Sequence, residues 1–282
     1  MSIHSIGVVG AGVMGGGIAE VAAMAGLPVT LVDVSDAALK KGIDRISANL
    51  VRLVAKGAVT PEATEAALRL VKATRGYDAL GEADLVVEAA TENIELKSEI
   101  VKRIGTVVRA DAVIATNTSS FSITKLASLV SEPGRFVGMH FFNPVPAMRL
   151  VEIVRGLRTD DATVEIVTVL AKQLGKTPIA VKNMPGFVVN RILLPMINEA
   201  FFVLEEGEAC AEEVDEGMKL GCNHPMGPLA LADLIGLDVV LSITEVFHRE
   251  FADSKYRPCL LLKELVQAGF LGRKTGRGVF VY

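Results

Sequence analysis

The order of apolar and polar positions divides the chain into two parts. Up to about residue 184, short apolar runs alternate with longer stretches in which apolar residues recur at helical spacing. Strands are predicted at 5–9, 29–32, 84–88, 112–115, 135–142, 150–154 and 177–181. Helices are predicted between them at 13–25, 36–56, 60–71 and 163–174, around Lys97, and from Ser122 onwards. This alternation predicts a doubly wound α/β sheet that is mostly parallel.

After Pro185 every segment has the pattern of a helix or a turn. Helices are predicted at 187–204, 211–220, 228–235, 237–250 and 259–268, and Pro195 should kink the first. We therefore expect a Rossmann-type domain at 1–185 and an all-helical domain at 186–282. The helical part has many apolar positions, so we expect it to bury one face against a second copy of the chain, as a homodimer.

Composition excludes several classes of protein. The net charge of −4 gives no general attraction for nucleic acid. The three cysteines, Cys210, Cys222 and Cys259, are too few and too widely spaced for a disulfide framework or a zinc site. We expect no metal, and we expect the thiols to be buried and reduced.

The stretch 6–32 is apolar enough to resemble a membrane span. It contains seven glycines, Pro28 and the charge of Glu20, and no Lys or Arg precedes it, so a span is rejected. The first predicted strand starts almost at Met1, which leaves no room for a signal peptide. We expect a cytoplasmic protein without a membrane anchor.

A glycine-rich motif joins the first strand to the first helix. It reads Gly10-Ala11-Gly12-Val13-Met14-Gly15, and Asp33 follows its last glycine by eighteen residues, at the end of the second strand. This context is typical of a dinucleotide site, in which backbone amides approach the pyrophosphate and the acid binds the ribose. No arginine occurs before Arg45, which favours NAD over NADP. The alternative is a tight turn that binds no ligand.

Two further segments carry candidate chemistry. If the runs on either side of Pro146 form a hairpin, His140 and Glu152 face each other, because both lie six residues from Pro146. A carboxylate beside an imidazole suits a general base; the alternative is a chance alignment of a strand histidine and a surface glutamate. The polar stretch 116–120 follows a strand, where open α/β sheets bind ligands, but it could equally cap the next helix.

Read together, these motifs resemble the short-chain L-3-hydroxyacyl-CoA dehydrogenases, and within them the bacterial branch that acts on 3-hydroxybutyryl-CoA. The resemblance covers essentially the whole chain. It rests on Asn-Thr-Ser-Ser, His-Phe-Phe-Asn-Pro-Val-Pro, Pro-Gly-Phe-Val-Val-Asn-Arg and His-Pro-Met-Gly-Pro, which occur in this order. It implies NAD-dependent oxidation of a 3-hydroxyacyl-CoA and the reverse reduction.

The resemblance also implies roles for individual residues. His140 would be the catalytic base and Glu152 its orienting partner, while Ser119 and Asn190 would contact the reacting oxygen. Residues on the nicotinamide side would be Glu92, Lys97, Ser119, Asn143 and Lys274. Lys56 would approach the CoA phosphates.

Two other functions remain open. The family includes a branch that oxidises sugar acids, against which the basic Lys56 argues mildly. A structural or sensing protein that binds NAD without catalysis is also compatible with the fold, but the intact pair of His140 and Glu152 argues against it.

Overall fold

The computed structural model describes residues 2–282, which fall into two units. The first unit extends to Met184 and the second from Pro185 to Tyr282, so the division lies one residue before the expected boundary. Each unit has a hydrophobic core of its own.

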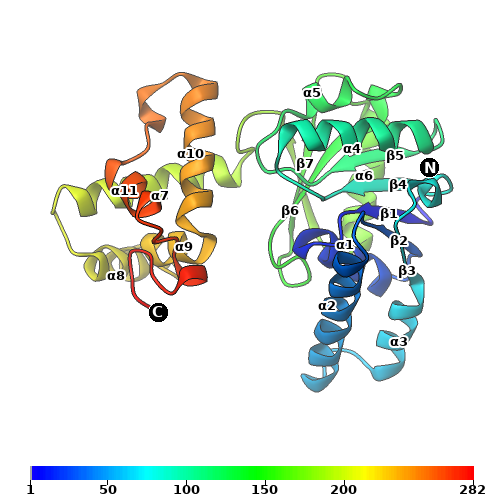
Figure 1. Ribbon diagram of the computed structural model, residues 1–282, viewed down its shortest axis with the longest axis horizontal. Coiled ribbons are helices and arrows are strands. Elements are labelled where there is room, and N and C mark those ends of the chain that lie inside the picture. Colours follow the sequence, from blue (N-terminus) through cyan, green and yellow to red (C-terminus); the bar gives the residue numbers. More distant parts are fainter. Residues whose placement is uncertain (1) are drawn as a thin grey trace. The chain divides into compact units, whose positions relative to one another are not determined.

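The first unit is built on one sheet of eight strands (Figure 1). Its strands, in spatial order, are β3 (Val71–Thr74), β2 (Val29–Val32), β1 (Ile6–Val9), β4 (Leu85–Glu88), β5 (Val113–Thr116), β6 (Phe136–Phe141), β7 (Leu150–Arg155) and β8 (Thr177–Lys182). Among the described residues every neighbouring pair is parallel except β6 and β7, which are antiparallel. The predicted doubly wound, mostly parallel sheet is confirmed.

Helices connect the strands of this sheet. They are α1 (Val13–Met24), α2 (Asp36–Ala55), α3 (Pro61–Leu70), α4 (Ile94–Val107), α5 (Ile123–Ala127) and α6 (Asp161–Gln173). The side chains of Ser35, Thr60, Asn93 and Ser122 each accept a hydrogen bond from the backbone of the first turn of the helix that follows. Apolar side chains of α1, α2, α3 and α6, such as Ile18 of α1 and Ile46 of α2, pack into one core with the strands.

One strand differs from the sequence prediction. The helix predicted to continue to residue 71 ends at Leu70, and residues 71–74 form β3 at the edge of the sheet. This strand is short, and the side chains of Lys72 and Ala73 are exposed. An edge strand needs no continuous apolar run, so its pattern resembles the last turn of an amphipathic helix.

The second unit is helical, as predicted (Figure 1). Its helices are α7 (Val189–Glu205), α8 (Ala211–Gly221), α9 (Pro228–Ile235), α10 (Leu237–Phe251) and α11 (Leu260–Gln267). Their core contains the fully buried side chains of Phe201, Leu229, Leu237 and Phe247. Pro195 lies inside α7.

The cysteines correct one expectation. Cys259 is buried, but Cys210 and Cys222 are exposed, and all three are free thiols. Within residues 2–282 no helix combines the length and apolarity that a membrane crossing requires. The same residues contain no group of three or more His, Cys, Asp or Glu side chains placed to hold a metal ion.

Candidate active site

The predicted pairing of His140 with Glu152 is present. The two residues are direct partners in the antiparallel register of β6 and β7, and His140 Nδ1 lies 2.7 Å from Glu152 Oε2. Both are buried, with exposed fractions of 6% and 0%. A carboxylate at Nδ1 favours the tautomer that carries its proton there, which leaves the lone pair on Nε2.

The turn between β6 and β7 is held from two sides. The Lys176 ammonium donates hydrogen bonds to the carbonyl oxygens of Val145 (2.5 Å) and Met148 (2.9 Å). On the other side Val145 packs against α1, where a methyl group added to Gly17 would lie 2.8 Å from Val145 Cβ. The turn is therefore fixed to the start of β8 and to the helix after the glycine motif.

Glu88 forms a buried polar cluster at the carboxyl end of β4. Its Oε2 accepts hydrogen bonds from Lys97 Nζ (2.5 Å) and Thr116 Oγ1 (2.6 Å), and its Oε1 accepts one from Ala90 N (2.9 Å). Lys97 is 0% exposed. The ammonium is therefore paired with the Glu88 carboxylate, and the role of Lys97 on the nicotinamide side, which the resemblance implied, remains a prediction.

Glu92 and Ser119 are brought together on neighbouring loops. The carboxylate of Glu92 accepts hydrogen bonds from Thr118 Oγ1 (3.0 Å) and from the backbone N–H of Ser119 (3.3 Å). Ser119 is half-buried, and Asn143, in the turn after β6, is exposed. The predicted polar stretch at 116–120 is therefore tied to Glu92. The residue that caps α5 is Ser122, two residues after this stretch.

The glycine motif has the shape that a pyrophosphate requires. A methyl group on Gly10 (φ +106°) would lie 2.6 Å from Ala89 O, and one on Gly15 would lie 1.8 Å from Gly10 O, so neither position tolerates a side chain. Gly12, directly before α1, has open space where its side chain would be. These features fit NAD, whose pyrophosphate would lie at the N-terminus of α1.

Other residues of the motif are placed around this loop. Val13 is exposed and Met14 half-buried, both in the first turn of α1. Asp33 follows β2, and its carboxylate accepts hydrogen bonds from the backbone N–H groups of Ala11 (2.9 Å) and Ser35 (3.0 Å). These bonds hold the Asp33 carboxylate beside the loop, where a ribose would bind.

A cavity of about 290 Å³ adjoins the glycine motif, between α1, α2 and the turn after β6. Its polar lining consists of Glu20, Arg45, Asn49, Arg52 and Asn143. Asn49 links the two helices by donating to Glu20 Oε2 at 2.9 Å and accepting from Arg52. Burial raises the pKa of the Glu20 carboxyl. Lys56 lies exposed at the C-terminal end of α2.

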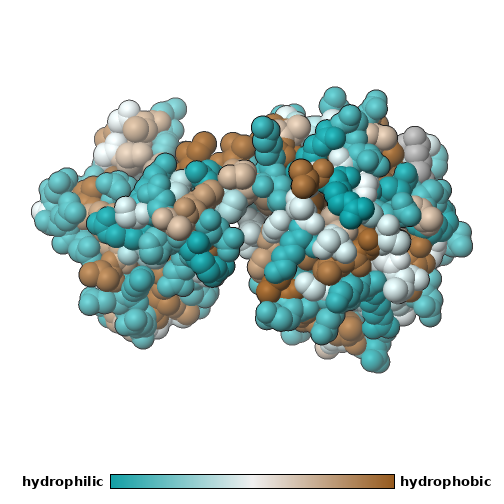
Figure 2. All heavy atoms as spheres, turned by 90° about the horizontal axis from the view of Figure 1, so that it is seen from above, coloured by the Kyte–Doolittle hydropathy of each residue, from teal (hydrophilic) through white to brown (hydrophobic). Residues whose placement is uncertain are grey.

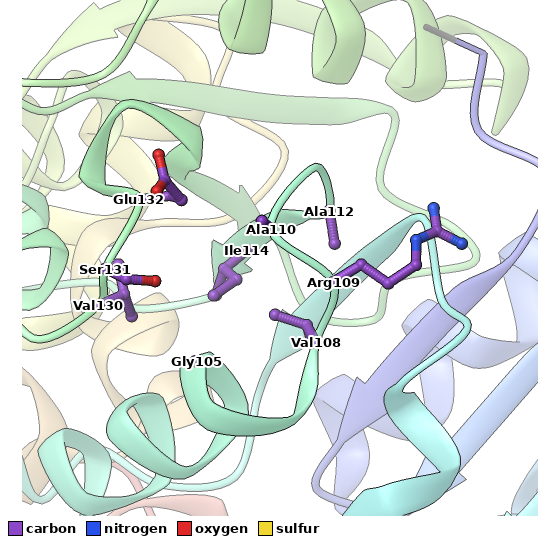
Figure 3. A pocket seen from close by; sticks show the side chains of 9 residues that line it. All are labelled: Gly105, Val108, Arg109, Ala110, Ala112, Ile114, Val130, Ser131 and Glu132. Atoms are coloured by element: carbon purple, nitrogen blue, oxygen red, sulfur yellow. The ribbon is translucent and has the colours of Figure 1, made fainter.

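A second, smaller hollow lies beside the start of the interior strand β5, next to the end of α4 (Figure 3). It encloses only about 20 Å³, enough for about one water molecule. Figure 3 shows Arg109 pointing away from the hollow, and its guanidinium pairs with Asp84 and Asp111. This hollow offers no room for a substrate.

Two of the predicted residues belong to the second unit. Asn190 is half-buried in the first turn of α7, and Lys274 forms an ion pair with Asp238. Their roles remain predictions. The sequence analysis did not identify Glu88, Asn117 or Lys176 as residues of the site, although Asn117 lies in the polar stretch 116–120.

Comparison with known proteins agrees with this arrangement. The family model for the NAD-binding domain of 3-hydroxyacyl-CoA dehydrogenase matches residues 5–184, and the model for the C-terminal domain of the same enzyme matches residues 186–282. A 3-hydroxybutyryl-CoA dehydrogenase from Bradyrhizobium diazoefficiens is 52% identical over 99% of this chain and 96% of its own length.

Two further relatives cover the whole chain. A probable 3-hydroxybutyryl-CoA dehydrogenase from Bacillus subtilis is 48% identical over 100% of this chain and 98% of its own length. The crystal structure of an (S)-3-hydroxybutyryl-CoA dehydrogenase from Ralstonia eutropha is 59% identical, with a TM-score of 0.98 over 100% of this chain and 99% of that chain. This chain belongs to the 3-hydroxyacyl-CoA dehydrogenase family, and it is an NAD-dependent oxidoreductase.

Proposed function

We propose that the chain oxidises a (3S)-3-hydroxyacyl-CoA, 3-hydroxybutyryl-CoA first of all, to the 3-ketoacyl-CoA, and that it catalyses the reverse reduction. The observation that carries this proposal is the buried contact of 2.7 Å between His140 and Glu152. The choice of 3-hydroxybutyryl-CoA as substrate rests on the names of the relatives, and the loop from Gly10 to Gly15 offers a site for NAD.

His140 would handle the proton of the reaction. Oxidation removes a proton from the 3-hydroxyl group and a hydride from C3, and NAD, when bound, accepts the hydride. The imidazole of His140 takes the proton, and the negative charge of Glu152 stabilises the imidazolium that results. In the reverse direction the imidazolium returns the proton to the oxygen.

Ser119 and Asn190 would hold the reacting oxygen. A hydroxyl group and an amide group can both donate hydrogen bonds to an oxygen on which negative charge develops. The hydrogen bond from the Ser119 backbone to Glu92 fixes the loop that carries the Ser119 hydroxyl. Asn143 and Lys274 would contribute on the nicotinamide side, as the resemblance implies.

Basic residues of α2 support an acyl-CoA substrate over a free sugar acid. Arg45 and Arg52 line the cavity beside the glycine motif, and Lys56 follows at the end of the same helix. Three cations along one helix suit a substrate that carries several phosphates. A small sugar acid has one carboxylate and would not need them.

An assay with matched substrates tests the proposal. NADH oxidation is followed with acetoacetyl-CoA and with longer 3-ketoacyl-CoAs, and NADH formation is followed with a free sugar acid. We expect acetoacetyl-CoA to give the highest kcat/KM. Activity with the sugar acid alone would assign the chain to that branch, and binding of NADH without turnover of any substrate would indicate a sensing or structural role.

We also propose that the chain acts as a cytoplasmic homodimer, in which two copies associate through their second units. Several large apolar side chains of this unit are exposed, among them Ile192 (67%), Leu220 (77%) and Leu260 (66%). Figure 2 shows hydrophobic residues interrupting the hydrophilic surface of this unit on the visible face. Covering such residues in a second copy would remove apolar surface from water.

A further inference from the structure

β6 extends further than the strand beside it. The backbone pairing of β5 with β6 ends at Thr116 and Gly138, whereas β6 continues to Phe141. On the opposite side β7 pairs with β6 up to Phe141. The segment that carries His140 therefore has a strand as neighbour on only one of its two edges.

The side chain of Asn117 takes the place of the missing strand. Its Oδ1 accepts a hydrogen bond of 2.8 Å from the backbone N–H of Phe141, the residue after His140, and the bond is buried. Its own backbone N–H donates to Glu88 O of β4 at 2.7 Å. Asn117 is 8% exposed, so water does not compete for this bond. Asn117 thus joins β4 to the end of β6 across the point where β5 stops.

Directly after Asn117 the chain leaves the sheet and presents Ser119. Thr118 Oγ1 accepts hydrogen bonds from the backbone N–H groups of Ser120 (3.3 Å) and Phe121 (3.1 Å), which turns the chain. The Ser119 N–H donates to Glu92. Asn117 is therefore two residues before Ser119 in the chain, and it is hydrogen-bonded to Phe141, the residue after His140.

We propose that Asn117 is a positioning residue that sets the place of His140 relative to Ser119. This inference rests on the proposed function, in which both side chains act on the same oxygen of the substrate. Proton transfer and oxygen binding require placement within a fraction of an ångström. Without the Asn117 oxygen, the buried N–H of Phe141 would lose its partner, and the end of β6 could move away from the Ser119 loop.

The test compares Asn117→Ala with Asn117→Asp. Alanine removes the acceptor, and a displacement of about 1 Å can cost roughly 10²-fold in rate, so we expect kcat with acetoacetyl-CoA to fall by about 10- to 100-fold. KM and the Kd of NADH should change by less than about threefold, because the proposal gives Asn117 no contact with either ligand. Aspartate retains an oxygen in the same place and should restore most of the lost kcat. Asn117→Ser, which is too short to reach Phe141, is the second variant if Asn117→Ala does not fold.

Two controls separate positioning from a general loss of structure. Thr159 Oγ1 donates to Phe136 O at 2.7 Å, at the opposite end of the same strand, so Thr159→Val should lower Tm and leave kcat unchanged. In a His140→Ala background, Asn117→Ala should cause no further loss of kcat, because the residue that it positions is absent. A multiplicative loss in that background, or near-normal kcat in both Asn117→Ala and Asn117→Ser, would overturn the inference. An inactive wild type would instead overturn the proposed function.

Discussion

His140 Nδ1 lies 2.7 Å from Glu152 Oε2, and the Glu152 side chain is completely buried. Because water does not screen this contact, the carboxylate acts on the imidazole more strongly than it would at the surface. In the proposed mechanism this pair combines the group that would exchange a proton with the carboxylate that would stabilise the imidazolium.

The first prediction concerns this pair. His140→Ala should lower kcat with acetoacetyl-CoA by roughly 10²- to 10⁴-fold, the usual contribution of a positioned proton-transfer group, while NADH binding is preserved. Glu152→Gln keeps the shape but removes the charge, so it should also lower kcat strongly. Steady-state kinetics, with circular dichroism to confirm folding, measures both effects.

The double variant tests whether the two residues act as a unit. It should be little worse than His140→Ala alone, because Glu152 then has no imidazole to orient. Losses that multiply would show that the residues act independently. Near-normal turnover of His140→Ala would remove the proposed mechanism altogether.

The second prediction concerns the cofactor. The Asp33 carboxylate is held beside the glycine motif by the Ala11 N–H, so it should bind the ribose of NADH and repel the 2′-phosphate of NADPH. We expect tighter binding of NADH in fluorescence titrations, and a smaller difference for Asp33→Ala. Asp36→Ala is the control, since Asp36 is an exposed carboxylate that pairs with Arg75. Equal affinities in the wild type would contradict the assignment.

The third prediction concerns Lys97. Lys97→Met leaves the buried carboxylate of Glu88 without its cation, so unfolding in denaturant should require about 3–5 kcal/mol less free energy. Lys40→Met is the matched control: its ion pair with Asp44 is exposed on both sides, and its loss should cost at most about 0.5 kcal/mol. A similar small cost for Lys97→Met would show that the buried pair is not structural.

The fourth prediction is a pH dependence of stability. Burial raises the pKa of Glu20 above its ordinary 4.5, so the folded chain holds this proton at pH values where the unfolded chain has lost it. The contribution of Glu20 to stability is therefore greatest at low pH and declines as the pH rises through the raised pKa. Glu20→Gln imitates the protonated form and lacks this decline. The Tm of the variant minus that of the wild type should increase between about pH 4.5 and pH 8.

An exposed glutamate provides the comparison for Glu20. Glu165 lies on the exposed side of α6, and Glu165→Gln should give the same Tm difference from the wild type at each pH. If Glu20→Gln behaves in the same way, the Glu20 carboxyl is not held in its protonated form.

The fifth prediction concerns assembly. Light scattering at micromolar concentration should give twice the 29.9 kDa mass of one chain. A stable two-fold interface should bury roughly 1,600 Å² or more in total. Ile192→Asp and Leu260→Asp should shift the mass towards that of one chain, whereas Leu157→Asp, an exposed leucine of the first unit, should not. A monomer in the wild type would refute the dimer.

The facing positions of His140 and Glu152 could be predicted because they follow from counting residues on either side of Pro146. The glycine motif could be predicted because only its residue types fit the contacts around Gly10 and Gly15. The edge strand β3 could not, because it has too few buried positions to show a strand pattern.

The partners of the Lys97 and Asn117 side chains also could not be predicted from the sequence pattern. A lysine on an amphipathic helix is usually exposed, and the burial of Lys97 on α4 depends on its ion pair with Glu88, the last residue of β4. The hydrogen bond that the Phe141 N–H donates to Asn117 Oδ1 depends on the residue at which the pairing of β5 with β6 ends, and the spacing of apolar residues does not indicate that residue.

The antiparallel pairing of β6 and β7 has a consequence for the inheritance of the site. His140 and Glu152 lie on a single hairpin, within residues 136–155, whereas the glycine motif and Asp33 lie more than a hundred residues earlier. A recombination between two relatives at any point outside this hairpin passes both partners to the same descendant. Chimeras that exchange the cofactor-binding segment at a junction ahead of residue 136 should therefore take His140 and Glu152 from the same parent. The cofactor preference of such chimeras can change while this pair stays together.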